Sequence, residues 1–113
     1  MSNRIMFLRD RSNQPVGCIA SSVNRKSWTI SYQLSVLNPH DHFDRKMARR
    51  LAIGGLSEAP ITIPIPYFGA DELSSHIITR AIMEDLATRK SLPSRAVKSA
   101  KLWLQDQWIT AAL

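Results

Sequence analysis

The clearest structural signal in the chain is the nine-residue stretch Trp28-Thr29-Ile30-Ser31-Tyr32-Gln33-Leu34-Ser35-Val36, in which apolar and polar residues alternate strictly. Because successive side chains of a strand point to opposite faces of a sheet, this pattern predicts a strand with one face on a hydrophobic core and one face in water. Half-exposed strands of this kind are typical of antiparallel sheets. We therefore expect the stretch to belong to a three-stranded meander over residues 4–37.

Two shorter apolar runs precede this stretch and complete the expected meander. The first is Ile5-Met6-Phe7-Leu8, which ends at a polar turn. The second is Val16-Gly17-Cys18-Ile19-Ala20, which opens at Pro15 and is followed by a second polar turn. Runs bounded in this way by turn residues are typical of β-hairpins.

A basic helix is expected directly after the meander, over residues 41–55. Asn38-Pro39 ends the strand, because a residue that precedes proline is driven away from helical geometry. Asp41 stands where a helix cap is needed, and Gly54-Gly55 stands where the helix would stop. The residues expected to face the core recur at helical spacing and are Phe43, Met47, Ala48, Leu51 and Ala52.

The remainder of the chain predicts one strand and two helices. Residues 61–66 alternate, but Pro64 and Pro66 cannot donate hydrogen bonds to a neighbouring strand, so we expect this segment at a sheet edge. Residues 71–89 and 92–111 carry apolar residues at helical spacing. The expected fold is α+β, with an antiparallel sheet of three or four strands, one helix after the meander and a C-terminal αα-hairpin. All of it is expected in a single domain over residues 1–113.

The composition is that of a small, basic, globular protein. The chain has 113 residues, and 15 Lys plus Arg against 9 Asp plus Glu give a formal net charge of +6, which favours anionic partners. The single cysteine, Cys18, excludes an internal disulfide and fits a reducing compartment. The chain shows no signal-peptide pattern and no stretch apolar enough to span a membrane, so we expect a cytoplasmic protein without a membrane partner.

The strongest functional signal is a cluster of four cations in the expected basic helix. Arg45 and Arg49 lie one turn apart, as do Lys46 and Arg50. The four are expected to form a ridge opposite Met47 and Leu51. Guanidinium groups bind phosphates and carboxylates in a bidentate manner, so the ridge is a candidate anion-binding surface, with Asn38 and His40 shaping the loop beside it. The alternative is an ordinary solvated helix face, partly neutralised by nearby carboxylates. The four residues are Arg45, Lys46, Arg49 and Arg50.

Imidazole and carboxylate groups in the same region are potential metal ligands. His40-Asp41-His42 and Asp44 supply them, but a zinc site needs three or four converging ligands, and only His76 and Cys18 could add nitrogen or sulfur from elsewhere. Helix capping by an aspartate explains the cluster more simply, so we expect no metal and no cofactor. Since the chain has no nucleophile elbow and no glycine-rich phosphate loop, we also expect no enzymatic activity.

The two C-terminal helices offer a second route to nucleic acid. Joined by a short connection, they could form a helix-turn-helix with Arg95, Lys98 and Lys101 on the outer face. The second half of the last helix is apolar nearly all round, which favours a packed hairpin or a dimer interface instead. Apolar residues beyond what a small core can hide mark association surfaces. The candidates for such an interface are Ile53 and Leu56, which fall off the expected inward side of the first helix, and Trp103.

The segment Asn38-Pro39-His40-Asp41-His42-Phe43, followed by a basic helix that ends in an Ala-x-Gly sequence, carries a family resemblance. It resembles small proteins encoded by bacteriophages and prophages, which share an Asn-Pro-x-Asp-x-Phe stretch and a basic helix. The strand over residues 15–20 fits the same pattern, so the resemblance covers about residues 4–57. This chain has Gly54-Gly55-Leu56 where the pattern continues Gly-Arg-Leu, so the role of that arginine is absent here.

The resemblance implies a non-enzymatic accessory protein that inhibits host defence or host machinery by binding protein, nucleic acid or a signalling nucleotide. One such group, the anti-Thoeris sponges, is similar in outline, with an antiparallel sheet followed by helices. We therefore expect a phage-derived binding protein, monomeric or homodimeric, that blocks a bacterial defence system in the host cytoplasm. Its target would be an anionic molecule, a defence protein or a ribonucleoprotein complex. The alternative is a small nucleic-acid-binding regulator that uses a basic helix.

Overall fold

The computed structural model describes residues 3–36, 44–65 and 74–112 of the chain. These residues form a four-stranded antiparallel sheet and three helices, so the fold is α+β, as the sequence predicts. The strand order follows the chain, β1-β2-β3-β4, and helices α2 and α3 pack together in a hairpin. The elements are β1 (Arg4–Arg9), β2 (Pro15–Asn24), β3 (Thr29–Val36), α1 (Arg45–Glu58), β4 (Ile61–Pro64), α2 (Ser75–Thr88) and α3 (Ser94–Ala112).

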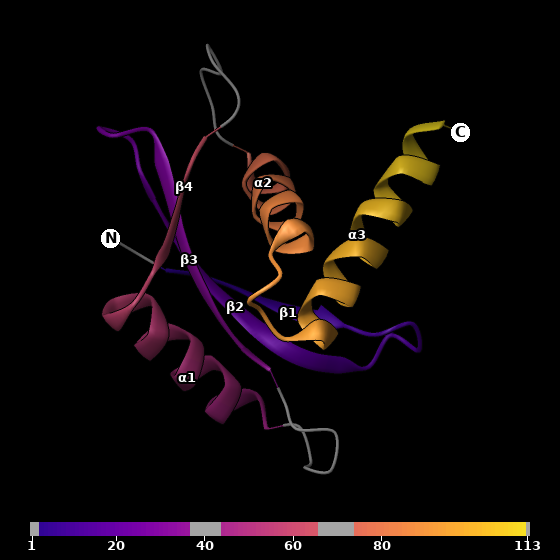
Figure 1. Cartoon of the computed structure of the whole chain (residues 1–113), viewed down its shortest axis with the longest axis horizontal. Helices are drawn as coiled ribbons and strands as arrows, with labels where there is room; N and C mark the ends of the chain where they lie inside the picture. The colour runs from indigo at the N-terminus through magenta and orange to yellow at the C-terminus, as the bar shows by residue number, and fades with distance from the viewer. Residues whose placement is uncertain (1–2, 37–43, 66–73, 113) are drawn as a thin grey trace.

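The helices cover both faces of the sheet. Helix α1 lies on one face, and α2 and α3 lie on the other, so the molecule has three layers (Figure 1). The alternation along β2 divides its side chains between two cores: Ile19 joins the cluster under α2 and α3, whereas Cys18 and Ala20 join the cluster under α1. The larger cluster is centred on Ile30, Tyr32 and residues of α2, and the smaller one is closed by α1.

The polar side of β3 does not face water over its whole length, contrary to the prediction. Helix α1 covers its second half. The Ser35 hydroxyl donates a 2.7 Å hydrogen bond to the Ala48 carbonyl, and Gln33 Nε2 donates a 2.9 Å bond to the Ala59 carbonyl. Polar side chains can therefore support a helix on a sheet when they bond to its backbone, since the bonds offset the loss of water.

The orientation and ends of α1 differ from the prediction. Its inward side includes the half-buried Ala48 and the buried Ala52 and Leu56, whereas Met47 and Leu51 are 47% and 57% exposed. Asp44, not Asp41, caps the helix: its side chain accepts bonds from the backbone N–H groups of the first turn. The helix also runs through both glycines to Glu58. The residues that meet β3, Ala48 and Gly55, are small, which lets the helix approach that strand closely.

Helix α3 closes one edge of the sheet. Strand β1 has β2 on one side only, and edge strands expose unpaired backbone groups. The buried Ser99 hydroxyl accepts a bond from the Arg9 backbone N–H at 3.1 Å and donates to the Arg9 carbonyl at 2.7 Å. The Arg4 guanidinium donates to Ser75 at the start of α2. Both ends of the edge strand are thus tied to the helical layer.

The opposite edge is the short strand β4, which pairs with β3 and agrees with the predicted edge strand. Its burial alternates, with Ile63 buried between the exposed Thr62 and Pro64. The proline lies at the end of the strand, where no further strand among the described residues requires its missing N–H. None of the helices that the structure describes is long and apolar enough to cross a membrane.

Candidate anion-binding surface

A groove of about 630 Å³ lies between the β1–β2 turn and the first half of α3. Its apolar floor includes Val16 and Leu102, and its lining carries four cations and one carboxylate. The carboxylate, Asp10, accepts bonds from the backbone N–H groups of Ser12 and Gln14, so it also fixes the turn. We call this cavity the hairpin groove. Its cations are Arg11, Arg95, Lys98 and Lys101.

A second groove, of about 490 Å³, lies on the other flank of α3, against the α2–α3 connection. Its lining includes the apolar side chains of Ala87, Leu92 and Val97, and none of its described lining residues carries a carboxylate. We call this cavity the connection groove. Its cations are Arg89, Lys90, Lys98 and Lys101.

Lys98 and Lys101 line both grooves and therefore form the ridge that separates them. Both are exposed, three residues apart on the outward face of α3, while Ala96 and Ala100 on the inward face are fully buried. The helix thus presents its basic face between two hollows. Lysine ammonium groups on such a ridge can contact an anionic chain that enters either groove.

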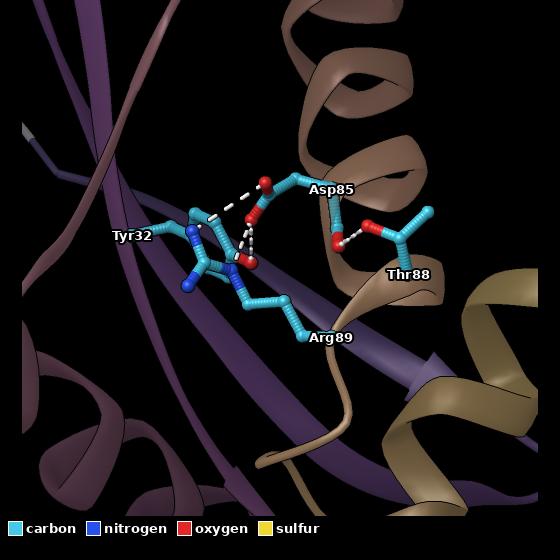
Figure 2. Close-up of polar contacts among 4 residues, drawn as sticks. All are labelled: Tyr32, Asp85, Thr88 and Arg89. Carbon is cyan, nitrogen blue, oxygen red and sulfur yellow. Dashed lines mark hydrogen bonds and ion pairs between the residues drawn. The ribbon is translucent and has the colours of Figure 1, made fainter.

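Arg89 belongs to a polar cluster that joins the sheet to α2 (Figure 2). Its Nε donates a 2.7 Å bond to Asp85 Oδ2, and the Tyr32 hydroxyl donates a 2.6 Å bond to the same oxygen. Burial of Tyr32, followed by its hydrogen bond to Asp85, raises the pKa of that phenol well above its ordinary value. The hydrogen bond to Asp85 raises the pKa of Arg89 as well. Because this arginine is paired, the available charge of the connection groove comes from its lysines.

The basic cluster predicted on the first helix lies on the opposite side of the sheet. The side chains of all four residues are exposed. Arg45 lies over the ring of Phe7 on β1, with its guanidinium carbon 5.2 Å from the ring centre, which is cation–π geometry. Arg49 lies near Cys18, whose pKa is raised by burial and lowered, to a smaller extent, by this positive charge. Lys46 and Arg50 are each followed in the sequence by one of the exposed apolar residues, Met47 and Leu51.

Several other predicted residues fall outside the described part of the chain. Asn38 and His40, expected beside the basic helix, lie there, as do Asp41 and His42 of the candidate metal cluster. Within residues 3–36, 44–65 and 74–112, no group of three or more His, Cys, Asp or Glu side chains is placed to hold a metal ion.

The three predicted interface residues contribute to packing within the chain. Leu56 is only 8% exposed and closes the smaller core together with Ala52, and Ile53 packs half-buried against the same cluster. Trp103 packs half-buried against the larger core, with its ring centre 5.7 Å from that of His76. The prediction that Ile53 and Leu56 lie off the inward side of the helix was wrong, because α1 is rotated relative to the expected orientation.

Comparison with known protein families, with curated proteins and with solved structures finds no match for this chain. The sequence pattern had pointed to Arg95, Lys98 and Lys101 as an outward face of the last helix, and the structure places all three on one groove. It did not point to Arg11 or Lys90. Each comes from a turn or connection that the fold brings against α3. The periodicity within one segment cannot predict which distant segment packs against it.

Proposed function

We propose that this protein is a non-enzymatic binding protein that holds an anionic polymer, most specifically a nucleic acid strand, across the two grooves of α3. The observation that supports this is the pair of adjoining cationic hollows with Lys98 and Lys101 between them. A sugar–phosphate backbone carries a regular series of negative charges, so it can bind both grooves and the ridge at once. The apolar floor near Val16 and Leu102 gives an unstacked base a surface to lie against.

A single strand fits these hollows better than a duplex. Its bases can turn away from the backbone and enter a cavity, which paired bases cannot do without unpairing. Helix α3 is also flanked by the β1–β2 turn on one side and the α2–α3 connection on the other, so it does not stand clear of its neighbours as a recognition helix must.

The resemblance of residues 4–57 to phage and prophage proteins supports a setting for this activity. In that setting the anionic target is a nucleic acid component of a bacterial defence system, and binding withholds it from the host. A signalling nucleotide is the second candidate, since the hairpin groove has the size of a small-molecule site and its cations suit phosphates.

The test is fluorescence anisotropy with a labelled single strand of about 20 nucleotides, the matching duplex, and a competing mononucleotide. We expect the single strand to bind most tightly, with log K falling by about 0.7 per phosphate neutralised for each tenfold rise in salt. The double variant Lys98→Glu/Lys101→Glu should weaken binding by about tenfold or more.

The matched control is Lys46→Glu/Arg50→Glu, which makes the same change of charge on the far side of the sheet. If this control weakens binding as much as the α3 variant does, long-range attraction and not the grooves accounts for the affinity. Tight binding of the mononucleotide alone would support the nucleotide candidate. Absence of any binding at low salt would overturn the proposal.

A further inference from the structure

The outward face of α1 carries the two large hydrophobic side chains that stand out as exposed in the described residues. Met47 is 47% exposed and Leu51 is 57% exposed. They lie one helical turn apart on the same line of the helix, so they form one apolar surface. The sheet packs against the other side of α1, through Ala52 and Leu56, and neither Met47 nor Leu51 belongs to the described core cluster there.

Gly54 continues the same line of the helix and is a second unexplained feature there. A Cβ atom added at Gly54 would meet nothing within 4 Å, whereas one added at Gly55 would meet Gln33 at 2.6 Å. The packing of the chain thus explains Gly55 but not Gly54. A glycine on an exposed helix face lets another backbone approach closely, as at helix crossings.

Met47, Leu51 and Gly54 have the i, i+4, i+7 spacing of a helix seam. Lys46 and Arg50 flank this seam on one side, and Asp44 at the start of the helix has its side chain engaged in capping. Glu58 is the one acidic residue within α1 itself. A symmetric pairing of two copies through this seam would bring the lysines and arginines of both together, which like-charge repulsion opposes.

From these features we propose that the outward face of α1 is a docking surface for an acidic amphipathic helix of another protein. The apolar side chains of the partner would lie on Met47 and Leu51, its backbone would approach at Gly54, and its carboxylates would reach Lys46 and Arg50. Nucleic acid is the less suitable occupant, since a phosphate backbone would leave the apolar pair and the glycine without a role. Helices α1 and α3 lie on opposite faces of the sheet (Figure 1), so this surface is separate from the grooves that α3 lines.

The test is a selection from a displayed library of random helical peptides of about 20 residues, using the whole protein as bait. We expect the enriched peptides to be acidic, with apolar residues at i and i+3 or i+4. A representative peptide should bind Met47→Glu and Leu51→Glu about tenfold more weakly or worse, and should shift the amide resonances of α1 in the unaltered protein.

Two further variants keep the test specific. Gly54→Gln places a side chain in open space, so the free protein should fold as before while peptide binding falls. Lys98→Glu/Lys101→Glu should leave peptide binding unchanged, which separates this surface from the proposed nucleic-acid grooves. The proposal would be overturned if no peptides were enriched, or if the enriched peptides were neutral or basic. It would also be overturned if the peptides bound the Leu51→Glu variant as tightly as the unaltered protein. Shifts of the α1 amides on addition of duplex DNA would instead assign the surface to nucleic acid.

Discussion

At the scale of single residues, the adjacent glycines of α1 have opposite surroundings. Gly54→Ala should stabilise the protein by about 0.5–1 kcal/mol, because alanine favours a helix and the site is open. Gly55→Ala should destabilise it by about 1–3 kcal/mol, because the new methyl group would clash with Gln33. Urea denaturation of both variants measures whether each substitution raises or lowers the free energy of unfolding. Equal shifts of the same sign would show that α1 does not pack on β3 as described.

Gln33 cannot move aside freely, which is why the second glycine matters. Its amide nitrogen donates to the Ala59 carbonyl at 2.9 Å, and its amide oxygen accepts from the Leu34 backbone N–H at the same distance. A Gln33→Ala substitution should therefore relieve the clash in the Gly55→Ala variant. Made by itself, Gln33→Ala should lower the free energy of unfolding. The pair forms a double-mutant cycle in which a favourable coupling is expected.

Tyr32 gives the molecule a sensitivity to alkaline pH. Since burial, and then the bond to Asp85, raise the pKa of this phenol, the folded chain keeps its proton where the unfolded chain has lost it. Stability from this group is complete below about pH 10 and falls as the pH rises further, by up to about 1.4 kcal/mol per pH unit. The urea midpoint should be measured between about pH 8 and 11.5. It should decline less with rising pH in the Tyr32→Phe variant than in the protein that keeps Tyr32.

The comparison should be made in a Cys18→Ala background. Burial also raises the pKa of the Cys18 thiol, so the stability that the protonated thiol contributes is lost over a lower alkaline range. That loss would overlap with the loss caused by Tyr32. At neutral pH, Tyr32→Phe should cost about 1–2 kcal/mol, because the hydrogen bond to Asp85 is removed. Identical pH slopes with and without the hydroxyl would mean that the phenol is accessible to water.

At the scale of elements, Ser99 tests how far α3 supports the sheet edge. Ser99→Ala should destabilise the protein by about 1–2 kcal/mol, because the backbone N–H and carbonyl of Arg9 lose their partner in a part-buried site. Amide hydrogen exchange should quicken at Arg9 more than elsewhere. Ser57→Ala, an exposed serine within α1, is the matched control and should change stability little. Uniform faster exchange over the whole chain would indicate a general loss of stability.

The types of most elements could be predicted from the sequence because their signals are local. The alternation that starts at Trp28 is a local signal for a strand, although Trp28 itself lies in the turn before β3, with a φ of 57°. The prolines of residues 61–66 confine that segment to an edge. The rotation of α1 could not be predicted, because it depends on the surface opposite. Hydrophobicity alone favours Met47 and Leu51 as the inward side, whereas the polar face of β3 requires small residues that allow close approach.

The candidate site was predictable only in part for the same reason. Lys98 and Lys101 could be assigned to an outward helix face from their spacing. The hairpin groove also needs Arg11, which comes from a turn far away in the sequence, and the connection groove needs Lys90. Cavities form between elements, so their lining becomes visible only once the tertiary arrangement is known.

At the scale of the whole molecule, the excess of positive charge is divided between two sides. The net charge is +6, with cationic side chains on α1 and on α3 across the sheet. Self-repulsion destabilises the compact state, and salt screens it over about 10 Å at 0.1 M. Raising NaCl from about 50 to 500 mM should therefore raise the thermal midpoint by a few degrees, on the order of 1 kcal/mol.

The charge-reversal variant Lys46→Glu/Arg50→Glu provides the control for this effect. It lowers the net charge by replacing two cations on one side, so its thermal midpoint should depend less on salt. Differential scanning calorimetry at several ionic strengths measures the dependence directly. If the thermal midpoint of the variant depended on salt as strongly as that of the unaltered protein, the salt effect would come from charges on the other side of the sheet or from ion binding.

The bond between Ser99 and Arg9 joins residues 90 positions apart, and this distance has a consequence for biosynthesis. The sheet's first strand leaves the ribosome long before the helix that shields its open edge. During that interval the nascent chain carries an apolar strand with exposed backbone groups, to which another chain could add. Docking of α3, and not completion of the sheet, is therefore the step that withdraws this edge from pairing with another chain.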